Sequence, residues 1–300
     1  MNDDHIALVA LTRTRPGGMT WRQITEQVLA TGSAIELWNE LQPSELDLAV
    51  TTEPAVALAK AADDLEEWRS QGLEFVSVLD DRFPARLRDI QETPPFLFAQ
   101  GLIDDDDQGV SVVGSRKASR GGLDFARETA SRLVGEGLSV VAGLALGIDT
   151  AAHSAALASG GRTVAFVATG LDRTYPKENR ELHAAIADTG LMLSQFLPGG
   201  PPQRHNFLMR NALMSGYGLA TIVVEAGEHS GARAQARMAV QHGRPVILTT
   251  RVVDSNEWAK RLQVSHDVYV VGSPEEAIKA VREIREEPHM IDLALDALVG

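Results

Sequence analysis

From residue 109 onward, short apolar segments alternate with single segments of helical pattern. Each apolar segment has the length of one strand and ends in glycine or a polar residue. Strands that are buried on both faces and joined by single helices are typical of an α/β fold with a doubly wound, mostly parallel sheet. The predicted strands are 110–113, 138–142, 163–168, 191–196, 220–225 and 245–249.

The segments between these strands have helical spacing of their apolar residues. We expect helices over residues 122–136, 149–158, 179–187, 207–215 and 231–242. Ligands of such sheets bind at the carboxyl ends of the strands. The glycines and polar residues of interest all follow a strand directly, so we expect one functional edge of the sheet.

The regions before and after this pattern are different. Residues 1–60 have helical character without visible chemistry, and short strands are expected at 75–79, 96–99 and 268–271. We therefore predict a small helical N-terminal domain over residues 1–65, a main domain over 66–290 and a tail over 291–300.

The charge distribution qualifies the acidic character of the chain. The net charge is −13, which argues against a nucleic-acid partner, but residues 111–251 hold 15 Lys and Arg against 10 Asp and Glu. Thirteen of these 15 cations are arginine, which binds phosphate through two parallel hydrogen bonds. The central region is thus locally basic, although charged ends around an ordinary surface explain the same numbers.

The composition excludes several classes. The chain has no cysteine, which excludes disulfides, thiolate metal sites and cysteine nucleophiles. No apolar run is long enough for a membrane span. The first residues lack the basic region of a secretory signal. We expect a cytoplasmic protein.

The first candidate motif is Gly114-Ser115-Arg116, directly after a predicted strand. Glycine allows close approach of a ligand, Ser115 offers a hydroxyl, and the next helix presents free N–H groups. The motif is either a phosphate-binding turn or an ordinary turn between a strand and a helix. It is not the G-x-G-x-x-G fingerprint, which disfavours a dinucleotide oxidoreductase.

The second motif runs from Gly143 through Gly147 and Asp149 to His153. Asp149 and His153 are four residues apart, on one helix face. This pair could bind a metal or act as acid and base. The alternative is that Asp149 caps the helix and that His153 fixes the loop through a hydrogen bond.

The third motif holds Gly170, Asp172, Tyr175 and Lys177. It places Lys177 at the same sheet edge as the first two motifs. Tyr175 could stack on a nucleobase or pack under the turn.

Two further motifs follow. Arg210 and Asn211 lie on a helix after a Pro/Gly-rich loop and look like a clamp for a ligand backbone. Glu225 ends a strand shortly before Ser230 and Gly231. Glu225 could act as a catalytic acid, bind the hydroxyls of a ribose, or accept hydrogen bonds from the N–H groups of a loop. The last role is favoured.

In this order the motifs resemble the DNA-processing protein A family, also called Smf. The resemblance covers roughly residues 65–250 and rests on the segments Gly114–Arg116, Gly143–Leu157, Gly170–Asn179, Leu193–Pro202, Arg210–Gly216, Val223–Ala226 and Ser230–Gly231. It implies an extended Rossmann-like domain that binds single-stranded DNA. It also implies a homodimeric, non-enzymatic mediator that loads the recombinase RecA during natural transformation or repair, with no metal or nucleotide cofactor.

The resemblance also assigns residues. Arg116 and Lys177 match the basic residues that contact DNA in the family, and Gly114, Ser115, Gly143, Arg210 and Asn211 would shape the phosphate pocket. The chain departs from the family pattern at Gln195, where glutamate is usual, and at Ala212, where arginine is usual. A nucleotide-binding sensor or nucleotide-processing enzyme of a related fold is the alternative function.

Overall fold

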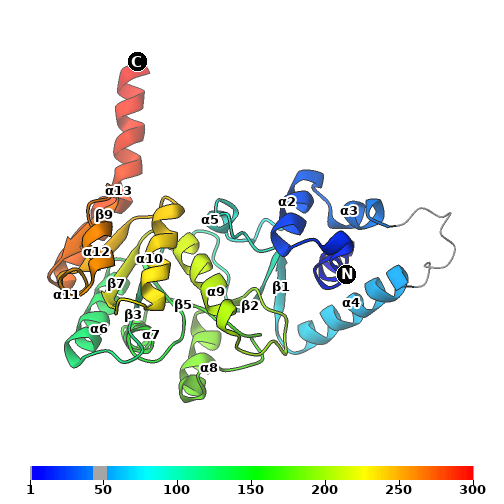
Figure 1. Cartoon of the computed structure of the whole chain (residues 1–300), viewed down its shortest axis with the longest axis horizontal. Coiled ribbons are helices and arrows are strands. Elements are labelled where there is room, and N and C mark those ends of the chain that lie inside the picture. The colour runs from blue at the N-terminus through cyan, green and yellow to red at the C-terminus, as the bar shows by residue number, and fades with distance from the viewer. Residues whose placement is uncertain (1, 43–52, 300) are drawn as a thin grey trace.

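The computed structural model describes residues 2–42 and 53–299, with residue 53 and residues 288–299 as backbone only (Figure 1). The described residues form a nine-stranded sheet in the order β1-β2-β6-β5-β4-β3-β7-β8-β9. The strands from β6 to β9 are parallel, whereas β2 is antiparallel to both of its neighbours. The expected α/β architecture with a mostly parallel, doubly wound sheet is confirmed.

Every strand expected from the sequence is present. The bounds are β1 (Glu74–Ser77), β2 (Phe96–Gly101), β3 (Gly109–Gly114), β4 (Ser139–Ala142), β5 (Thr163–Phe166), β6 (Leu191–Ser194), β7 (Thr221–Glu225), β8 (Val246–Thr249) and β9 (Val268–Val271). Their predominantly apolar sequences explain this agreement, because a strand covered on both faces needs apolar residues at nearly every position.

Helices cover both faces of the parallel strands. One face holds α6 (Arg120–Gly135), α7 (Ile148–Ala158) and α13 (Pro274–Val299), whose apolar residues form one core with β3, β4 and β7. The 3-10 turn η2 (Lys177–Asn179) leads into α8 (Arg180–Thr189), which contacts α7. The other face holds α9 (Arg204–Tyr217) and α10 (Gly231–Gln241), which pack against each other.

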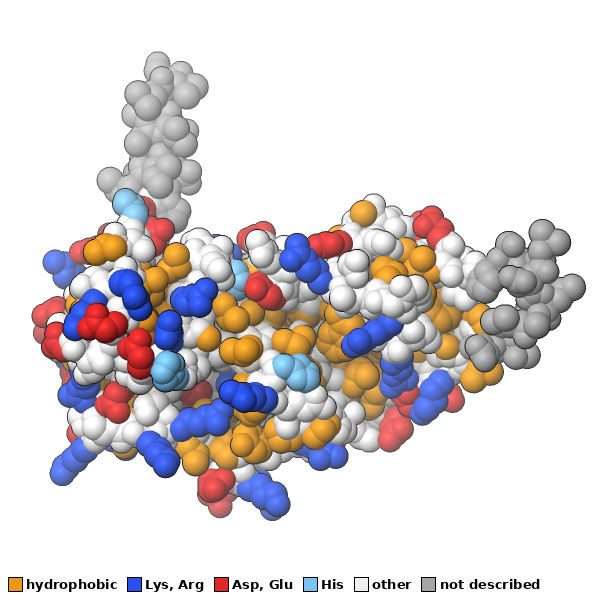
Figure 2. All heavy atoms as spheres, in the orientation of Figure 1, with side chains coloured by type: hydrophobic (Ala, Val, Ile, Leu, Met, Phe, Trp, Pro, Cys, Tyr) orange, Lys and Arg blue, Asp and Glu red, His pale blue; other side chains and the backbone are white. Residues whose placement is uncertain are grey.

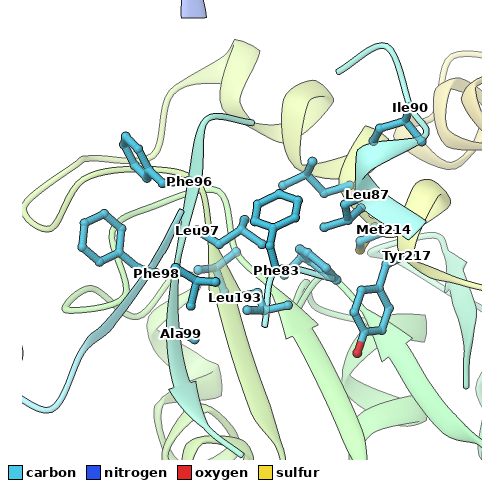
Figure 3. Close-up of a cluster of buried hydrophobic side chains, with 14 of the residues drawn as sticks. Phe83, Leu87, Ile90, Phe96, Leu97, Phe98, Ala99, Leu193, Met214 and Tyr217 are labelled. Atoms are coloured by element: carbon cyan, nitrogen blue, oxygen red, sulfur yellow. The ribbon is translucent and has the colours of Figure 1, made fainter. Parts of the chain in front are cut away.

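Short helices complete the main part of the chain. They are α5 (Ala85–Arg88), α11 (Thr250–Ser255) and α12 (Glu257–Leu262). Figure 3 shows the apolar cluster in which Phe83, just before α5, and Leu87 of α5 lie with Met214 and Tyr217 of α9 and Leu193 of β6. This cluster fixes α9 against the sheet, and α9 in turn carries several of the candidate site residues.

The N-terminal part is helical, as expected. It consists of α1 (Asp3–Thr14), the 3-10 turn η1 (Pro16–Gly18), α2 (Trp21–Thr31), α3 (Ala34–Glu40) and α4 (Glu53–Ser70). Thr20 begins α2 with a capping box, in which its hydroxyl accepts from the N–H of Gln23 and its own N–H donates to the Gln23 side chain.

The N-terminal helices share a core with the antiparallel edge of the sheet. The ring of Trp21 lies 5.5 Å from that of Phe96, and Trp68 lies 5.1 Å from Phe98. The boundary expected at residue 65 falls within α4, so the division into domains stays a prediction. In the segment expected as a tail, 291–300, α13 continues to Val299, because this segment is rich in the helix formers Ala and Leu.

Candidate nucleic-acid interface

The strand order places a change of winding direction at β3. The chain moves from β3 through β4 and β5 to β6 on one side, and then returns to place β7 on the other side of β3. In doubly wound sheets ligands bind at the carboxyl edge beside such a switch point. Gly114 ends β3 at this point, and the turn Ser115–Arg116 follows it.

A cleft of about 660 Å³ opens at this edge between the end of β3 and the N-terminal halves of α9 and α10. We call it the basic cleft. It is lined by eight of the residues expected at the site, namely Gly114, Ser115, Arg116, Asp149, Arg210, Asn211, Ser230 and Gly231. Lys117 and Arg204 line it as well, so four Lys and Arg side chains face one carboxylate.

The surface around the cleft is basic and partly apolar. Figure 2 shows Lys and Arg side chains, with hydrophobic ones between them, on the part of this face that holds α9 and α10. Leu208, whose side chain also lines the cleft, is 47% exposed. The combination suits a ligand that has both anionic groups and apolar faces.

Arg210 forms part of the cleft wall with an almost fully buried guanidinium. Its Nη1 donates to the carbonyl oxygen of Phe166 at 3.0 Å, while its Nε has no hydrogen-bond partner among the described residues. Burial lowers the pKa of Arg210 to about 10, and the charge of Asp149 opposes that shift. The side chain therefore stays protonated at neutral pH and adds a fixed positive charge to the cleft.

Gly143 provides the space that Arg210 occupies. A Cβ atom at this position would lie 1.4 Å from Nη1 of Arg210, far inside van der Waals contact. Glycine is therefore required at the end of β4, because the guanidinium passes directly over its backbone. This contact explains a glycine that the sequence indicated only as a point of close approach.

Asp149 anchors the loop between β4 and α7. Its carboxylate accepts from the N–H groups of Gly143 at 3.0 Å and Ala145 at 3.3 Å. Burial raises the pKa of the Asp149 carboxyl, and the charge of Arg210 and the two backbone hydrogen bonds act against the increase. Gly147 has a φ of 83°, and a Cβ there would collide with the carbonyl oxygen of Ser115.

His153 is buried below the loop and outside the basic cleft. Its Nδ1 lies 2.6 Å from Oγ1 of Thr163, which donates its own proton to the carbonyl of Val140, so Nδ1 carries a hydrogen and donates. Burial lowers the pKa of His153 to about 3. Among the described residues no group of three or more His, Asp or Glu is placed to hold a metal ion. The geometry favours structural roles for both residues. Asp149 ties the preceding loop and does not cap α7 as expected, because the N-cap Gly147 has no side-chain hydrogen bond, and His153 bonds to Thr163 of β5.

The third motif borders the cleft without lining it. Asp172 accepts from the N–H of Gly199, and the N–H of Gly170 donates to the carbonyl of Gly200. The motif is therefore hydrogen-bonded to the Pro/Gly-rich loop, residues 198–202. The Tyr175–Pro176 bond is cis. Lys177 is exposed and follows Tyr175, whose ring lies 5.7 Å from that of Phe207 on α9.

Glu225 lies beside the basic cleft and anchors a loop. Its carboxylate accepts from the N–H and the hydroxyl of Ser119, which begins α6, and pairs with Arg251. Burial raises the pKa of Glu225, but the hydrogen bonds from Ser119 and Arg251 outweigh burial and hold it below its usual value. Ser230 begins α10, where its hydroxyl accepts from the N–H of Arg233, and Asn211 donates to the carbonyl of Gly231.

Phe207 is the main residue that sequence reasoning missed. The guanidinium carbon of Arg116 lies 5.0 Å from the centroid of its ring. The helix α9 begins at Arg204, three residues earlier than expected. Arg204, Phe207, Leu208 and Asn211 therefore share one helix face, at the spacing i, i+3, i+4 and i+7. This spacing in the sequence could have placed Phe207 on the same helix face as Arg204 and Asn211.

Residues 74–281 match the family model described as DNA recombination-mediator protein A. The chain belongs to this family. The Smf protein of Synechocystis sp. is 36% identical over 208 residues, which cover 68% of this chain and 52% of that protein, so the chain spans about half the length of this relative. The DNA processing protein DprA of Streptococcus pneumoniae is 36% identical over 240 residues, covering 78% of this chain and 84% of that protein.

Solved structures agree with the family assignment. The crystal structure of DprA from Streptococcus pneumoniae has a TM-score of 0.72 and 30% identity, and covers 93% of this chain and 98% of that chain. A Helicobacter pylori DprA structure, described in terms of single-stranded DNA binding, shares the fold with a TM-score of 0.63, 22% identity and coverage of 70% and 96%. Family membership and the Rossmann-like α/β fold are thus confirmed. No described helix is long and apolar enough to cross a membrane.

Proposed function

We propose that the protein binds single-stranded DNA in the basic cleft and acts as a recombination mediator. The observation that carries this proposal is the position of Arg116 over the ring of Phe207 at a cleft whose wall holds the buried charge of Arg210. An arginine stacked on an aromatic ring is held in place while its N–H groups remain available for phosphate.

Three sources of positive potential meet in the cleft. They are the side chains of Arg116, Lys117 and Arg204, the buried guanidinium of Arg210, and the N-terminal end of α10 at Ser230 and Gly231. Backbone N–H groups at a helix N-terminus favour anions, and a cation of fixed geometry adds to them. This arrangement supports binding of a phosphodiester chain.

Lys177 extends this surface along the rim. Phe207 contacts Arg116 on one side and Tyr175 on the other, and Tyr175 precedes Lys177 by two residues. The two cations that we assign to DNA binding therefore belong to loops that meet at the same aromatic side chain. One strand could contact both in sequence, with Gly114, Ser115, Gly143 and Asn211 shaping the floor.

The aromatic and apolar side chains favour an unpaired strand. Tyr175 is 41% exposed, and Leu208 is exposed beside Phe207. Bases stack on exposed rings only when they are not covered by neighbouring base pairs, and each stacked base contributes about 1–3 kcal/mol. A duplex offers phosphates alone and would bind less tightly.

The test compares labelled single- and double-stranded oligonucleotides of one sequence by fluorescence anisotropy at low salt. We expect the single strand to bind more tightly by at least the contribution of one stacked base, roughly five-fold. Equal affinities, or no binding, would contradict the proposal. A thermal-shift series with mononucleotides tests the alternative function, because a nucleotide sensor would be stabilised by its ligand and not by the oligonucleotide.

We further propose that the protein is a non-enzymatic homodimer that loads RecA onto bound strands in the cytoplasm. The family description as a recombination mediator supports this role. Assembly of RecA on single strands covered by single-strand-binding protein should proceed faster when the protein is added, without cleavage of the DNA. Light scattering checks the dimer, and cell fractionation checks the compartment. A monomer, or unchanged RecA assembly, would contradict the corresponding part.

A further inference from the structure

A second cavity lies on the other side of α9 from the basic cleft. It has a volume of about 190 Å³ and is lined by residues of α2, of the loop 91–95 and of α9, together with Gln195 after β6. Met209 lines this cavity, while the adjacent Leu208 lines the basic cleft. We call it the Gln195 cavity.

Gln195 is the unusual residue of this cavity. The residue is 3% exposed, and its amide makes no hydrogen bond to any residue in the described ranges 2–42 and 53–299, yet neither amide atom is among the fully enclosed polar atoms that lack a partner. A primary amide has two donor hydrogens and an acceptor oxygen. The amide atoms therefore keep a little accessible surface, at the cavity that Gln195 lines. An amide that lines a cavity without a protein partner is available to a ligand.

The two charged residues at the rim of the cavity already have polar partners. Nε of Arg22 lies 2.7 Å from the carboxylate of Glu26, and Glu92 lies 2.8 Å from Nε2 of His242. Both amides that line the cavity, the buried Gln195 and the exposed Gln91, are uncharged. A neutral ligand that offers both a donor and an acceptor fits these amides better than an ion does.

The remaining walls are apolar and partly flat. They come from the ring of Trp21, the consecutive Pro94 and Pro95, and Met209. The indole of Trp21 is fixed, because its Nε1 donates to the carbonyl of Thr12 at 3.2 Å and its ring packs against Phe96. Such walls suit a planar ring system with apolar faces.

We propose that the Gln195 cavity receives one nucleobase of the strand that the basic cleft holds, with its hydrogen-bonding edge paired to the amide of Gln195. This inference rests on the proposed function. Nucleobases combine flat faces that stack on aromatic rings with edges that carry donors and acceptors, and glutamine can pair with such an edge through two hydrogen bonds. The cleft and the cavity are separated by α9 alone, a width of about 10–12 Å.

The assignment gives the N-terminal helices a part in DNA binding. Trp21 and Arg22 belong to α2, whereas Gln195 directly follows β6 of the sheet, so the cavity forms only where the two parts of the chain meet. Phosphate contacts in the basic cleft would position the strand, and the cavity would hold a base that leaves it across α9.

Tryptophan fluorescence provides the test. All four tryptophans lie in described residues, and Trp38, Trp68 and Trp258 are buried, which leaves Trp21 as the partly exposed one. A single-stranded oligonucleotide should quench the emission on binding, and an abasic strand of equal length should bind without that quenching. The quenching should be absent in Trp21→Phe.

The affinity of variants supplies a second readout on the full-length chain. Gln195→Met removes the amide at similar volume and should weaken binding of the base-bearing strand roughly five-fold or more. Its affinity for the abasic strand should be unchanged. Because the amide has no partner in the described protein, the variant should unfold at the same denaturant concentration as the original chain. Gln241→Met, at the exposed end of α10, is the matched control.

The two proposals fail in different ways. If neither strand binds, both the proposed function and the base-binding cavity are wrong. If both strands bind through Arg116 but the emission is not quenched and Gln195→Met binds both equally well, only the cavity proposal is overturned.

Discussion

The guanidinium of Arg116 lies over the ring of Phe207, with its central carbon 5.0 Å from the ring centroid. Arg116 follows β3 and Phe207 belongs to α9, so this contact joins two segments that are 91 residues apart in the chain. Because the ring also meets Tyr175, Phe207 connects the two loops to which we assign the DNA-contacting cations.

Replacing Phe207 with leucine should therefore weaken binding of single-stranded DNA. The change removes the ring that orients Arg116, an effect of about 0.5–1 kcal/mol at an exposed site. It also removes an aromatic surface for a base, worth about 1–3 kcal/mol. We expect an affinity loss of roughly ten-fold, measured by anisotropy. Phe125→Leu on α6, at the opposite face of the sheet, should bind DNA normally, and equal affinities of the two variants would contradict this role of Phe207.

Replacing Gly143 with alanine should destabilise the fold and impair DNA binding together. The new methyl group would occupy the position of the Arg210 guanidinium, which cannot move without losing its hydrogen bond to Phe166. Overpacking of this kind costs about 1–3 kcal/mol. Urea unfolding measures the loss, and Gly227→Ala, where no atom lies within 4 Å of the added Cβ, is the control. A Gly143→Ala variant as stable as the control would show that Arg210 has room to shift.

The buried His153 should make the stability depend on pH. Its pKa is about 3 in the folded state and 6.5 as its ordinary value, so between these values the unfolded chain binds a proton that the folded chain does not. Stability should therefore fall as the pH decreases from about 6.5 toward 3, by up to about 1.4 kcal/mol per pH unit.

The measurement compares urea unfolding of the original chain and His153→Gln at several pH values. The variant should be less stable at neutral pH, because it loses the buried imidazole and its hydrogen bond to Thr163. Its free energy of unfolding should decrease less between pH 6.5 and 4 than that of the original chain. The difference between the two profiles isolates His153, since the raised pKa of Asp149 acts in the opposite direction. Parallel profiles would mean that His153 takes up a proton in the folded protein.

The sequence predicted the strands and the edge of the sheet where the candidate residues meet. Buried strands such as Val110–Val113 have apolar residues at every position or nearly so, and their glycine ends mark the carboxyl edge. The role of Glu225 as an anchor of backbone N–H groups was also favoured in advance, whereas Asp149 was considered as a helix cap and instead accepts from N–H groups of the loop before α7.

What the sequence could not predict depends on contacts between distant segments. The space that Gly143 leaves for Arg210 joins the end of β4 to α9, and no local pattern encodes that approach. The same holds for the stack of Arg116 on Phe207 and for the cavity at Gln195, which exists only because α2 packs beside the end of β6. The early start of α9 was missed because its N-cap is Gln203, and glutamine is not one of the residues (Ser, Thr, Asp, Asn) that mark a helix start in a sequence.

The most direct measurement of the central claim is the salt dependence of single-stranded DNA binding for the original chain and for Arg116→Ala/Lys177→Ala. Each phosphate contact contributes about −0.7 to the slope of log affinity against log salt for a single strand. We expect the double variant to bind more weakly, with a slope shallower by about 1.4. The control Arg132→Ala/Lys279→Ala removes the same charge from exposed ion pairs on α6 and α13 and should keep the original affinity and slope. If the Arg116 and Lys177 double variant has the affinity and slope of the original chain, the strand does not bind at this edge of the sheet.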